Sequence, residues 1–437
     1  MNSRPRRAGS DAAAGTRGKR ALRLFLALTT IAIAVVSCAT APPDNTSIPL
    51  RPYEPSTPLV SAFPTPSITK PVDNRNPGSV VSVADPTEAV DGDLLAVGAT
   101  VKRIVYRSTS GIDDSPTLVS GIAVIPNGPP PNGGWPVVAY GHPSSGVKPV
   151  CAPSLFSSML GNAGVLAALV VGGYAVVMSD YQGLGQPGYV HPFLDSKTYG
   201  NNMIDAVRAI RAIAPENVST QWVAYGSSLG GLAAWAAADR ATAYGQGLTL
   251  LGTAAISPFA DMTELVDRAV DGTMTRDQYP LYIYLLQTMS QTYPSMRLDD
   301  YRSPFARSVW ATALECLPSA RTSPDDIVRA LTSLGPDDLR PASPAAAAFV
   351  RSKLAERALP IGTNPAPTLV TYGTDDQSSP PQWTERAIAR SCANGQKLDV
   401  IKRVGETSAE LDAGQSVAFI NTVRTSGWTF TNCEQRP

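Results

Sequence analysis

The sequence predicts an α/β protein with a mainly parallel sheet and helices on both faces. Short apolar runs alternate with stretches of helical periodicity along the 437 residues, an order that is typical of such sheets. Residues 173–178 are continuously apolar, as expected of a strand that is buried on both faces. Residues 221–232 pass from a strand pattern through Gly-x-Ser-x-Gly into an alanine-rich helix pattern. We therefore expect one large domain with insertions.

The predicted elements follow one another from residue 101 to residue 423. Strands, bounded by Gly, Pro, Asn or Ser, are expected at 101–106, 118–125, 136–140, 173–178, just before the Gly-x-Ser-x-Gly motif, and at 248–256, 368–372 and 398–404. Helices are expected at 201–214, 229–238, 381–391 and 408–423. Residues 261–360 show no strand pattern and predict an all-helical insertion.

The motif at residues 226–230 carries the chemistry. A strand, this motif and a helix in succession form the nucleophile elbow of an α/β-hydrolase, whose turn lifts the Ser228 hydroxyl clear of the sheet. Gly226 and Gly230 leave room for the tight crossing. The amide of Leu229, at the start of the helix, is expected to point at a developing oxyanion.

The usual base for such a serine is missing. A serine hydroxyl needs a base to take its proton, and in this fold the order is serine, acid, histidine. The chain has only two histidines, His142 and His191, and both precede Ser228.

The N-terminal residues predict export. In residues 1–38, basic residues precede an apolar run at 24–36 that is too short to span a membrane, as in a signal peptide. The run ends in a pattern similar to a bacterial lipobox, in which Cys38 is lipidated and anchors the protein to a membrane. The alternative is an ordinary cleaved signal. Residues 39–92, rich in Pro, Ser and Thr, are expected to form a tether, followed by the catalytic-type domain at 93–437.

Composition excludes some functions and leaves others open. The net charge is zero, so no nucleic-acid partner is expected. No spacing typical of a metal site is found, and no cofactor is expected. Four further cysteines in an exported chain suggest two disulfides with three possible connectivities. They are Cys151, Cys316, Cys392 and Cys433.

Several motifs in one order resemble the secretory lipases, meaning the fungal lipase A-like group and its actinobacterial members. The motifs are YGHPSSG at 140–146, CAPS at 151–154, DYQGLGQPG at 180–188 with HP at 191–192, DAVRA at 205–209, and the elbow. The resemblance spans about residues 95–433. It implies export, an α/β-hydrolase fold with a helical cap, and hydrolysis of lipid esters. The cap residues 279–286 are strongly apolar and aromatic, and two roles remain open for them: lining an acyl-chain pocket, or packing the cap against the core.

The resemblance also implies roles for individual residues. Ser228 matches the nucleophile, and Asp376, after a predicted strand, matches the acid. Ser145 matches the second oxyanion donor, beside Leu229. Cys392 and Cys433 match a family disulfide, which leaves Cys151 and Cys316 as the second pair. His142 and His191 match histidines that are not the base, and a structural role is expected for both.

The sequence departs from the family at the base. Aligning residues 403–411 with the family's final loop puts Glu406 at the histidine position, or Thr407 or Ser408 if the register slips. A free glutamate is a weaker base than histidine at neutral pH. If Glu406 faces Asp376, repulsion between the two carboxylates raises one of their pKa values.

Three hypotheses follow. The first is a membrane-anchored carboxylic ester hydrolase that works slowly or with an altered base. The second is an inactive lipase relative that binds lipids at the cell envelope. The third is an acyltransferase that uses the Ser228 acyl-enzyme.

Overall fold

The computed structural model describes residues 76–86, 90–316, 322–364 and 366–433. The predicted signal peptide, Cys38 and most of the predicted tether lie outside these residues. Among the described residues, no helix has both the length and the apolar character needed to cross a membrane.

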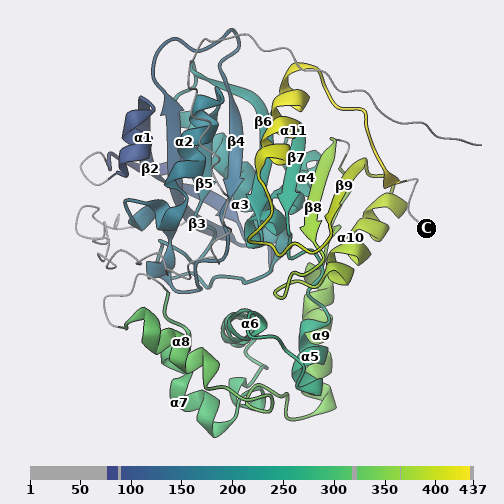
Figure 1. Ribbon diagram of the computed structural model, residues 1–437. Coiled ribbons are helices and arrows are strands. Elements are labelled where there is room, and N and C mark those ends of the chain that lie inside the picture. Colours follow the sequence, from purple (N-terminus) through teal and green to yellow (C-terminus); the bar gives the residue numbers. More distant parts are fainter. Residues whose placement is uncertain (1–75, 87–89, 317–321, 365, 434–437) are drawn as a thin grey trace, which may run out of the picture. The chain divides into compact units, whose positions relative to one another are not determined.

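A nine-stranded sheet organises the described residues, in the order β1-β2-β3-β5-β4-β6-β7-β8-β9 (Figure 1). The strands are β1 (Val80–Ala84), β2 (Ala99–Thr109), β3 (Pro116–Pro126), β4 (Trp135–Gly141), β5 (Ala175–Ser179), β6 (Val218–Ser227), β7 (Thr249–Ile256), β8 (Thr368–Gly373) and β9 (Leu398–Arg403). The strands from β5 to β9 pair in parallel, and β1, β2 and β3 pair antiparallel with their neighbours. The predicted mainly parallel sheet is therefore confirmed.

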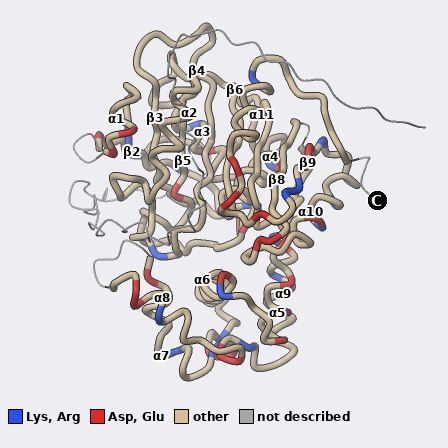
Figure 2. Tube along the Cα trace, in the orientation of Figure 1, with Lys and Arg blue, Asp and Glu red and all other residues tan. Residues whose placement is uncertain are grey.

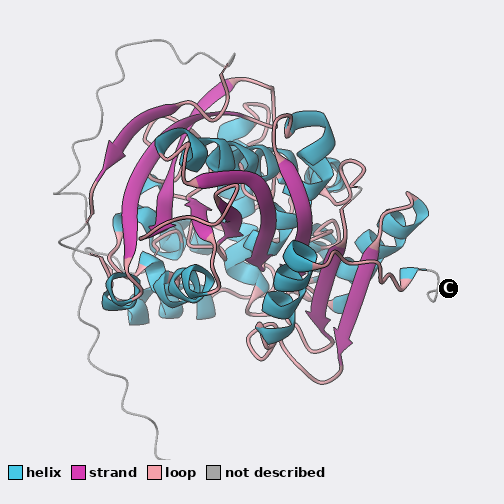
Figure 3. Cartoon of the chain, turned by 90° about the horizontal axis from the view of Figure 1, so that it is seen from above, coloured by secondary structure: helices cyan, strands magenta, loops and turns pink. Residues whose placement is uncertain are grey.

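Helices cover both faces of the twisted sheet (Figure 3). Side chains of α1 (Gly92–Ala96), α2 (Ala163–Val171) and α11 (Gly414–Thr425) share one buried cluster with the sheet. Side chains of α3 (Ser196–Ile213), α4 (Leu229–Tyr244) and α10 (Pro381–Ala393) belong to the cluster on the other face. Short 3₁₀ helices occur at η2 (Pro149–Cys151), η3 (Pro153–Leu155), η4 (Met159–Gly161) and η5 (Leu298–Asp300).

Some elements differ from those that the sequence predicts. The sheet begins at Val80, inside the segment expected to be a tether, because β1 pairs with β2. Helix α2 was not expected, because its sequence AGVLAALVV is apolar all round and shows no helical stripe. Helix α11 begins at Gly414 rather than at residue 408, which lengthens the loop after β9.

Only helices lie between β7 and β8 in the described chain, as the sequence predicts. They are α5 (Leu265–Asp271), α6 (Gln278–Thr292), α7 (Pro304–Ala313), α8 (Pro324–Thr332) and α9 (Pro344–Arg357), and together we call them the cap (Figure 1). Helices α7, α8 and α9 each begin with a serine N-cap followed by proline. In each, the serine hydroxyl accepts a backbone N–H of the first turn, which fixes where the helix starts.

The aromatic run at residues 279–286 mainly packs the cap against the core, one of the two roles that the sequence left open. Tyr282, Leu285 and Leu286 are fully buried in the core cluster that the cap shares with the sheet. Tyr284 instead lines a cavity beside the loop after β4. Most of this run therefore packs the cap, and one side chain faces a cavity.

Acidic and basic residues are interspersed in both the sheet domain and the cap (Figure 2). Several pair locally along the cap, as in Arg302–Asp299 and Arg340–Asp337. Such exposed pairs contribute little to stability. The pKa shifts discussed below for the site therefore concern buried groups.

Candidate active site

Ser228 sits in a strained turn between β6 and α4. Its φ of 57° and ψ of −120° are unusual for a residue with a side chain, and such strain gathers at functional sites. The turn is held on both sides: the Ser228 N–H donates to the Ile256 carbonyl over 2.8 Å, and the Ser228 carbonyl accepts the amides of Leu232 and Phe259. The backbone therefore presents this side chain at the carboxyl end of β6.

Three glycines make this turn possible. A Cβ atom on Gly226 would lie 2.3 Å from the Gly230 carbonyl oxygen, and one on Gly230 would lie 1.9 Å from the Gly141 carbonyl oxygen. Gly141 ends β4, so the start of α4 packs directly on the neighbouring strand. No side chain fits at either position of the Gly-x-Ser-x-Gly motif without moving backbone.

The candidate oxyanion donors lie on either side of this crossing. Leu229 is the first residue of α4, where the free N–H groups and the helix dipole favour negative charge. Ser145 lies in the loop after β4. Its hydroxyl is buried and finds no hydrogen-bond partner among the described residues. The strands that precede these two residues, β4 before Ser145 and β6 before Leu229, are adjacent and parallel.

Asp376 follows β8 and is 5% exposed. One of its oxygens, Oδ1, accepts the amides of Ser378 (2.9 Å) and Ser379 (3.1 Å). Burial raises the pKa of Asp376 above its ordinary value, and these amides and the nearby Ser257 hydroxyl offset part of the rise. Asp277, at the start of α6, adds a smaller increase to this pKa.

The loop after β9 places Glu406 beside the acid loop. The Glu406 carbonyl accepts the amide of Asp375 over 3.0 Å, and a Cβ atom on Gly373 would lie 2.1 Å from the same oxygen. The Glu406 side chain is half-buried and makes no hydrogen bond or ion pair with a described residue. The largest cause of the raised Asp376 pKa is burial, so the predicted repulsion between two carboxylates is not what dominates there.

Local hydrogen bonds explain why α11 starts later than expected. The Glu410 carboxylate accepts the amide and hydroxyl of Thr407. The Asp412 carboxylate accepts the amide of Gly414 over 2.8 Å. The short side chains of Thr407 and Asp412 compete with helical hydrogen bonds and favour turns. Glu406 is therefore separated from the final helix by a structured turn.

Both histidines are buried within the sheet domain. The His142 Nδ1 lies 2.7 Å from the Pro143 carbonyl, and its ring stacks on Tyr181. The His191 Nδ1 lies 2.7 Å from the Gln182 carbonyl, and its Nε2 lies 3.1 Å from the Tyr199 hydroxyl. Burial lowers the pKa of His142 and brings that of His191 to about 4. These contacts agree with the structural role expected for both.

Two disulfides form, with the pairing that the resemblance implies. Cys151–Cys316 joins the loop after β4 to the cap. Cys392–Cys433 joins α10 to the C-terminal segment. That segment covers the outer edge of β9, where Asn432 exchanges hydrogen bonds with the Val400 backbone. The bond thus helps to protect an edge strand.

A cavity of about 450 Å³ lies between the loop after β4 and the cap. Ser144 and Ser145 contribute from the loop, Tyr284 from α6 and Ile327 from α8. The lining is completed by Pro143, Leu160, Gly161, Asn162, Glu315 and Cys316. Its size suits a small-molecule ligand. The cavity thus reaches one of the two candidate oxyanion donors.

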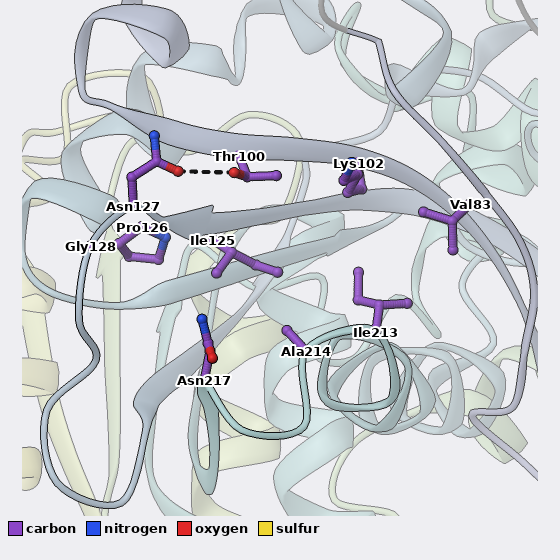
Figure 4. A pocket seen from close by; sticks show the side chains of 10 residues that line it. All are labelled: Val83, Thr100, Lys102, Ile125, Pro126, Asn127, Gly128, Ile213, Ala214 and Asn217. Carbon is purple, nitrogen blue, oxygen red and sulfur yellow. Dashed lines mark hydrogen bonds between the residues drawn. The ribbon is translucent and has the colours of Figure 1, made fainter.

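A second cavity, of about 580 Å³, is remote from this site (Figure 4). Its lining includes Asn217, directly before β6, and Ile213 at the end of α3. It therefore opens at the amino ends of the parallel strands, whereas Ser228 lies at their carboxyl ends. Among the described residues, no cluster of His, Cys, Asp or Glu is suited to a metal ion.

Comparison with known proteins shows which family this chain resembles. The family model for secretory lipases matches residues 158–322, which include Ser228 but not Ser145, Asp376 or Glu406. No curated protein matches. The predicted resemblance to the secretory lipases is confirmed, and the fold is an α/β-hydrolase of the lipase/esterase type.

Three solved structures are similar to this chain. Lipase A of Candida antarctica in its closed state has a TM-score of 0.67 at 15% identity, covering 85% of this chain and 89% of that one. The rice cell wall degrading esterase LipA of Xanthomonas oryzae has a TM-score of 0.61 at 22% identity, covering 82% and 100%. A putative hydrolase of Legionella pneumophila has a TM-score of 0.62 at 17% identity, covering 80% and 100%. At these identities the likeness establishes the fold.

One residue of the site has no signal in the sequence. Ser257, directly after β7, has a φ of 39° and is 2% exposed. It belongs to no motif, and only the strand order brings it next to the acid loop: its amide donates to the Thr371 carbonyl of β8 over 2.7 Å.

Proposed function

We propose that this protein is a carboxylic ester hydrolase that acts through a covalent Ser228 acyl-enzyme. The observation that carries the proposal is the strained Ser228 turn at the start of α4, because that strain has no structural use unless the hydroxyl must face a substrate. The secretory lipase match supports an ester as the substrate class.

Each step uses residues of this chain. The Ser228 Oγ bonds to the acyl carbon, and its proton passes to a base. The Leu229 amide and Ser145 stabilise the oxyanion that forms. The alcohol leaves with the proton held by the base. The base then takes a proton from water, whose oxygen bonds to the acyl carbon; the bond from that carbon to the Ser228 Oγ breaks, the carboxylic acid leaves, and Oγ regains the proton from the base. Asp376 orients the base that takes up the Ser228 proton and returns it.

Glu406 is our candidate for the base. Its backbone contact with Asp375 supports this assignment, because it places residue 406 beside the acid loop. A carboxylate accepts the Ser228 proton less readily than an imidazole at neutral pH. Loss of a triad member typically costs about 10⁴ to 10⁶ in kcat, so we expect slow turnover.

The substrate is an ester of a lipid, and the cavity beside Ser145 is its proposed binding site. Tyr284 and Ile327 supply apolar surface for an acyl chain. Glu315, which pairs with Lys148, makes one wall polar. The cap therefore forms part of the substrate site in this proposal.

We also propose export and anchoring at the outer face of a membrane. Two disulfides support an oxidising compartment. Residues 1–38 serve as the signal with its lipobox, Cys38 carries the lipid, and the following Pro-rich residues tether the domain. Metabolic labelling with a fatty acid, lost in Cys38→Ala, tests this part.

A second candidate is an inactive relative that binds lipids. The observation that favours it is the Glu406 side chain, which has no hydrogen-bond partner in the described chain and so lacks the orientation of a working base. Hydrolysis of short and long p-nitrophenyl esters by the full chain and by Ser228→Ala separates the two. Turnover that is lost in the variant supports the hydrolase, and equal background rates support the lipid-binding protein.

A further inference from the structure

Ser257 occupies a position between the nucleophile and the acid. It follows β7, which lies between β6 with Ser228 and β8 with the acid loop. Its preceding residue, Ile256, accepts the Ser228 amide, and its own amide donates to Thr371 of β8. Its backbone is thus bonded directly to the strand of the acid, and its neighbour to the nucleophile turn.

The side chain of Ser257 is buried, but its hydroxyl has no hydrogen-bond partner among the described residues. It is 2% exposed, and its hydroxyl forms no hydrogen bond of good geometry with a described residue. A buried hydroxyl without a partner costs free energy. The positive φ of 39° adds strain that a serine rarely accepts without a functional reason.

Asp376 has a carboxylate oxygen, Oδ2, that is free to accept a hydrogen bond from the Ser257 hydroxyl. Both amides that bind Asp376 donate to Oδ1, so Oδ2 accepts no hydrogen bond from a described residue. The Ser257 hydroxyl is near enough to lower the pKa of Asp376, although it falls short of hydrogen-bond geometry. Hydrogen bonds of catalytic groups often align only when substrate binds.

We infer that Ser257 is a positioning residue: its hydroxyl donates to Oδ2 of Asp376 and holds that carboxylate toward Ser228. This inference rests on the proposed function. It adds a contact between Ser257, after β7, and Asp376, after β8. Neither the nucleophile nor the base takes part in this contact.

Other groups around the acid must be separated from this effect. Asp277, at the start of the cap helix α6, raises the pKa of Asp376, and Glu406 lies on the loop after β9. Within the acid loop, Gln377 accepts the hydroxyl of Thr275 and so ties the loop to the cap. None of these changes when Ser257 is replaced, so a shift in that variant reports the hydroxyl.

The test compares Ser257→Ala, Ser257→Thr and Ser391→Ala in the full chain. Ser391 is a matched control, because its hydroxyl is also fully buried and without a partner, but it lies in α10. We expect Ser257→Ala to lower kcat about tenfold and to move the acidic limb of the pH profile of kcat/KM upward by about one pH unit. Ser257→Thr should restore the limb at least in part, and Ser391→Ala should leave it in place.

If the acidic limb of the kcat/KM profile lies at the same pH in Ser257→Ala as in wild type, the inference is overturned. If the wild-type chain shows no Ser228-dependent turnover, the proposed function fails, and the inference is then judged by a second measurement. Carbon-13 NMR of labelled aspartate, with the signal assigned by Asp376→Asn, gives the pKa of Asp376 without turnover. A higher pKa in Ser257→Ala than in wild type supports the contact, and an equal pKa refutes it.

Discussion

Replacing Glu406 with histidine should restore the missing base. The Glu406 carbonyl holds the amide of Asp375, so an imidazole at position 406 starts next to the acid loop. The full penalty for lacking a triad member is about 10⁴ to 10⁶ in kcat. The groups around residue 406 are not arranged to orient an imidazole, so only part of this loss should be recovered. We expect Glu406→His to raise kcat by about 10² or more. The assay is hydrolysis of p-nitrophenyl butyrate and palmitate, with kcat and KM measured separately.

Three control variants show whether an increase in kcat comes from an imidazole that acts on Ser228. Glu406→Gln keeps the size of the side chain but removes its charge, and it should lower the residual rate if Glu406 is the base. Glu406→His combined with Ser228→Ala should show no gain, because the imidazole has no hydroxyl to activate. Thr407→His tests the register by one residue. A folded Glu406→His protein with the wild-type kcat, and no gain in Thr407→His, would refute the assignment of the base position.

Three further predictions concern the scaffold. Gly226→Ala should lower the free energy of unfolding by about 1–3 kcal/mol and abolish turnover, because its Cβ atom meets the Gly230 carbonyl; urea unfolding and the ester assay check both. Burial raises the pKa of Asp239 to about 7, so the folded chain binds this proton more tightly than the unfolded chain, and stability should fall as pH rises from about 4 to 7. In Asp239→Asn that loss should vanish. Urea midpoints of both proteins, measured between about pH 4 and 7, would contradict this if they changed equally with pH. Replacing Cys392 and Cys433 by serine should cost about 4 kcal/mol by the loop-entropy relation for a separation of 41 residues; thermal unfolding with no loss would contradict it.

The fold was largely predictable because its signals are local. Continuous apolar runs mark the parallel strands, and the glycines of the elbow mark the crossing that needs them. β1 was missed because its five residues lie inside the segment expected to be a tether, although they pair with β2. The late start of α11 was missed because Glu410 and Asp412 form local turns that the apolar spacing of residues 408–423 does not reveal.

The site was predictable only in part, for a different reason. Ser228 is indicated by its motif, whereas Asp376 and Glu406 were assigned by resemblance to a family rather than by a pattern of their own. Ser257 has neither signal. Its place depends on the order β6-β7-β8, which brings the ends of three strands together although they are far apart in the sequence. Single-residue contacts of this kind need the structure.

The acyl-enzyme itself is the most direct test of the account. Intact-mass spectrometry of the full chain, taken at intervals from minutes to hours after mixing with p-nitrophenyl butyrate and followed by peptide mapping, should show one butyryl group on the peptide that carries Ser228. Slow deacylation by a weak base should make this adduct accumulate, and Ser228→Ala should lack it. A wild-type chain that carries no adduct, or one that carries it equally in Ser228→Ala, would contradict the proposed serine hydrolase.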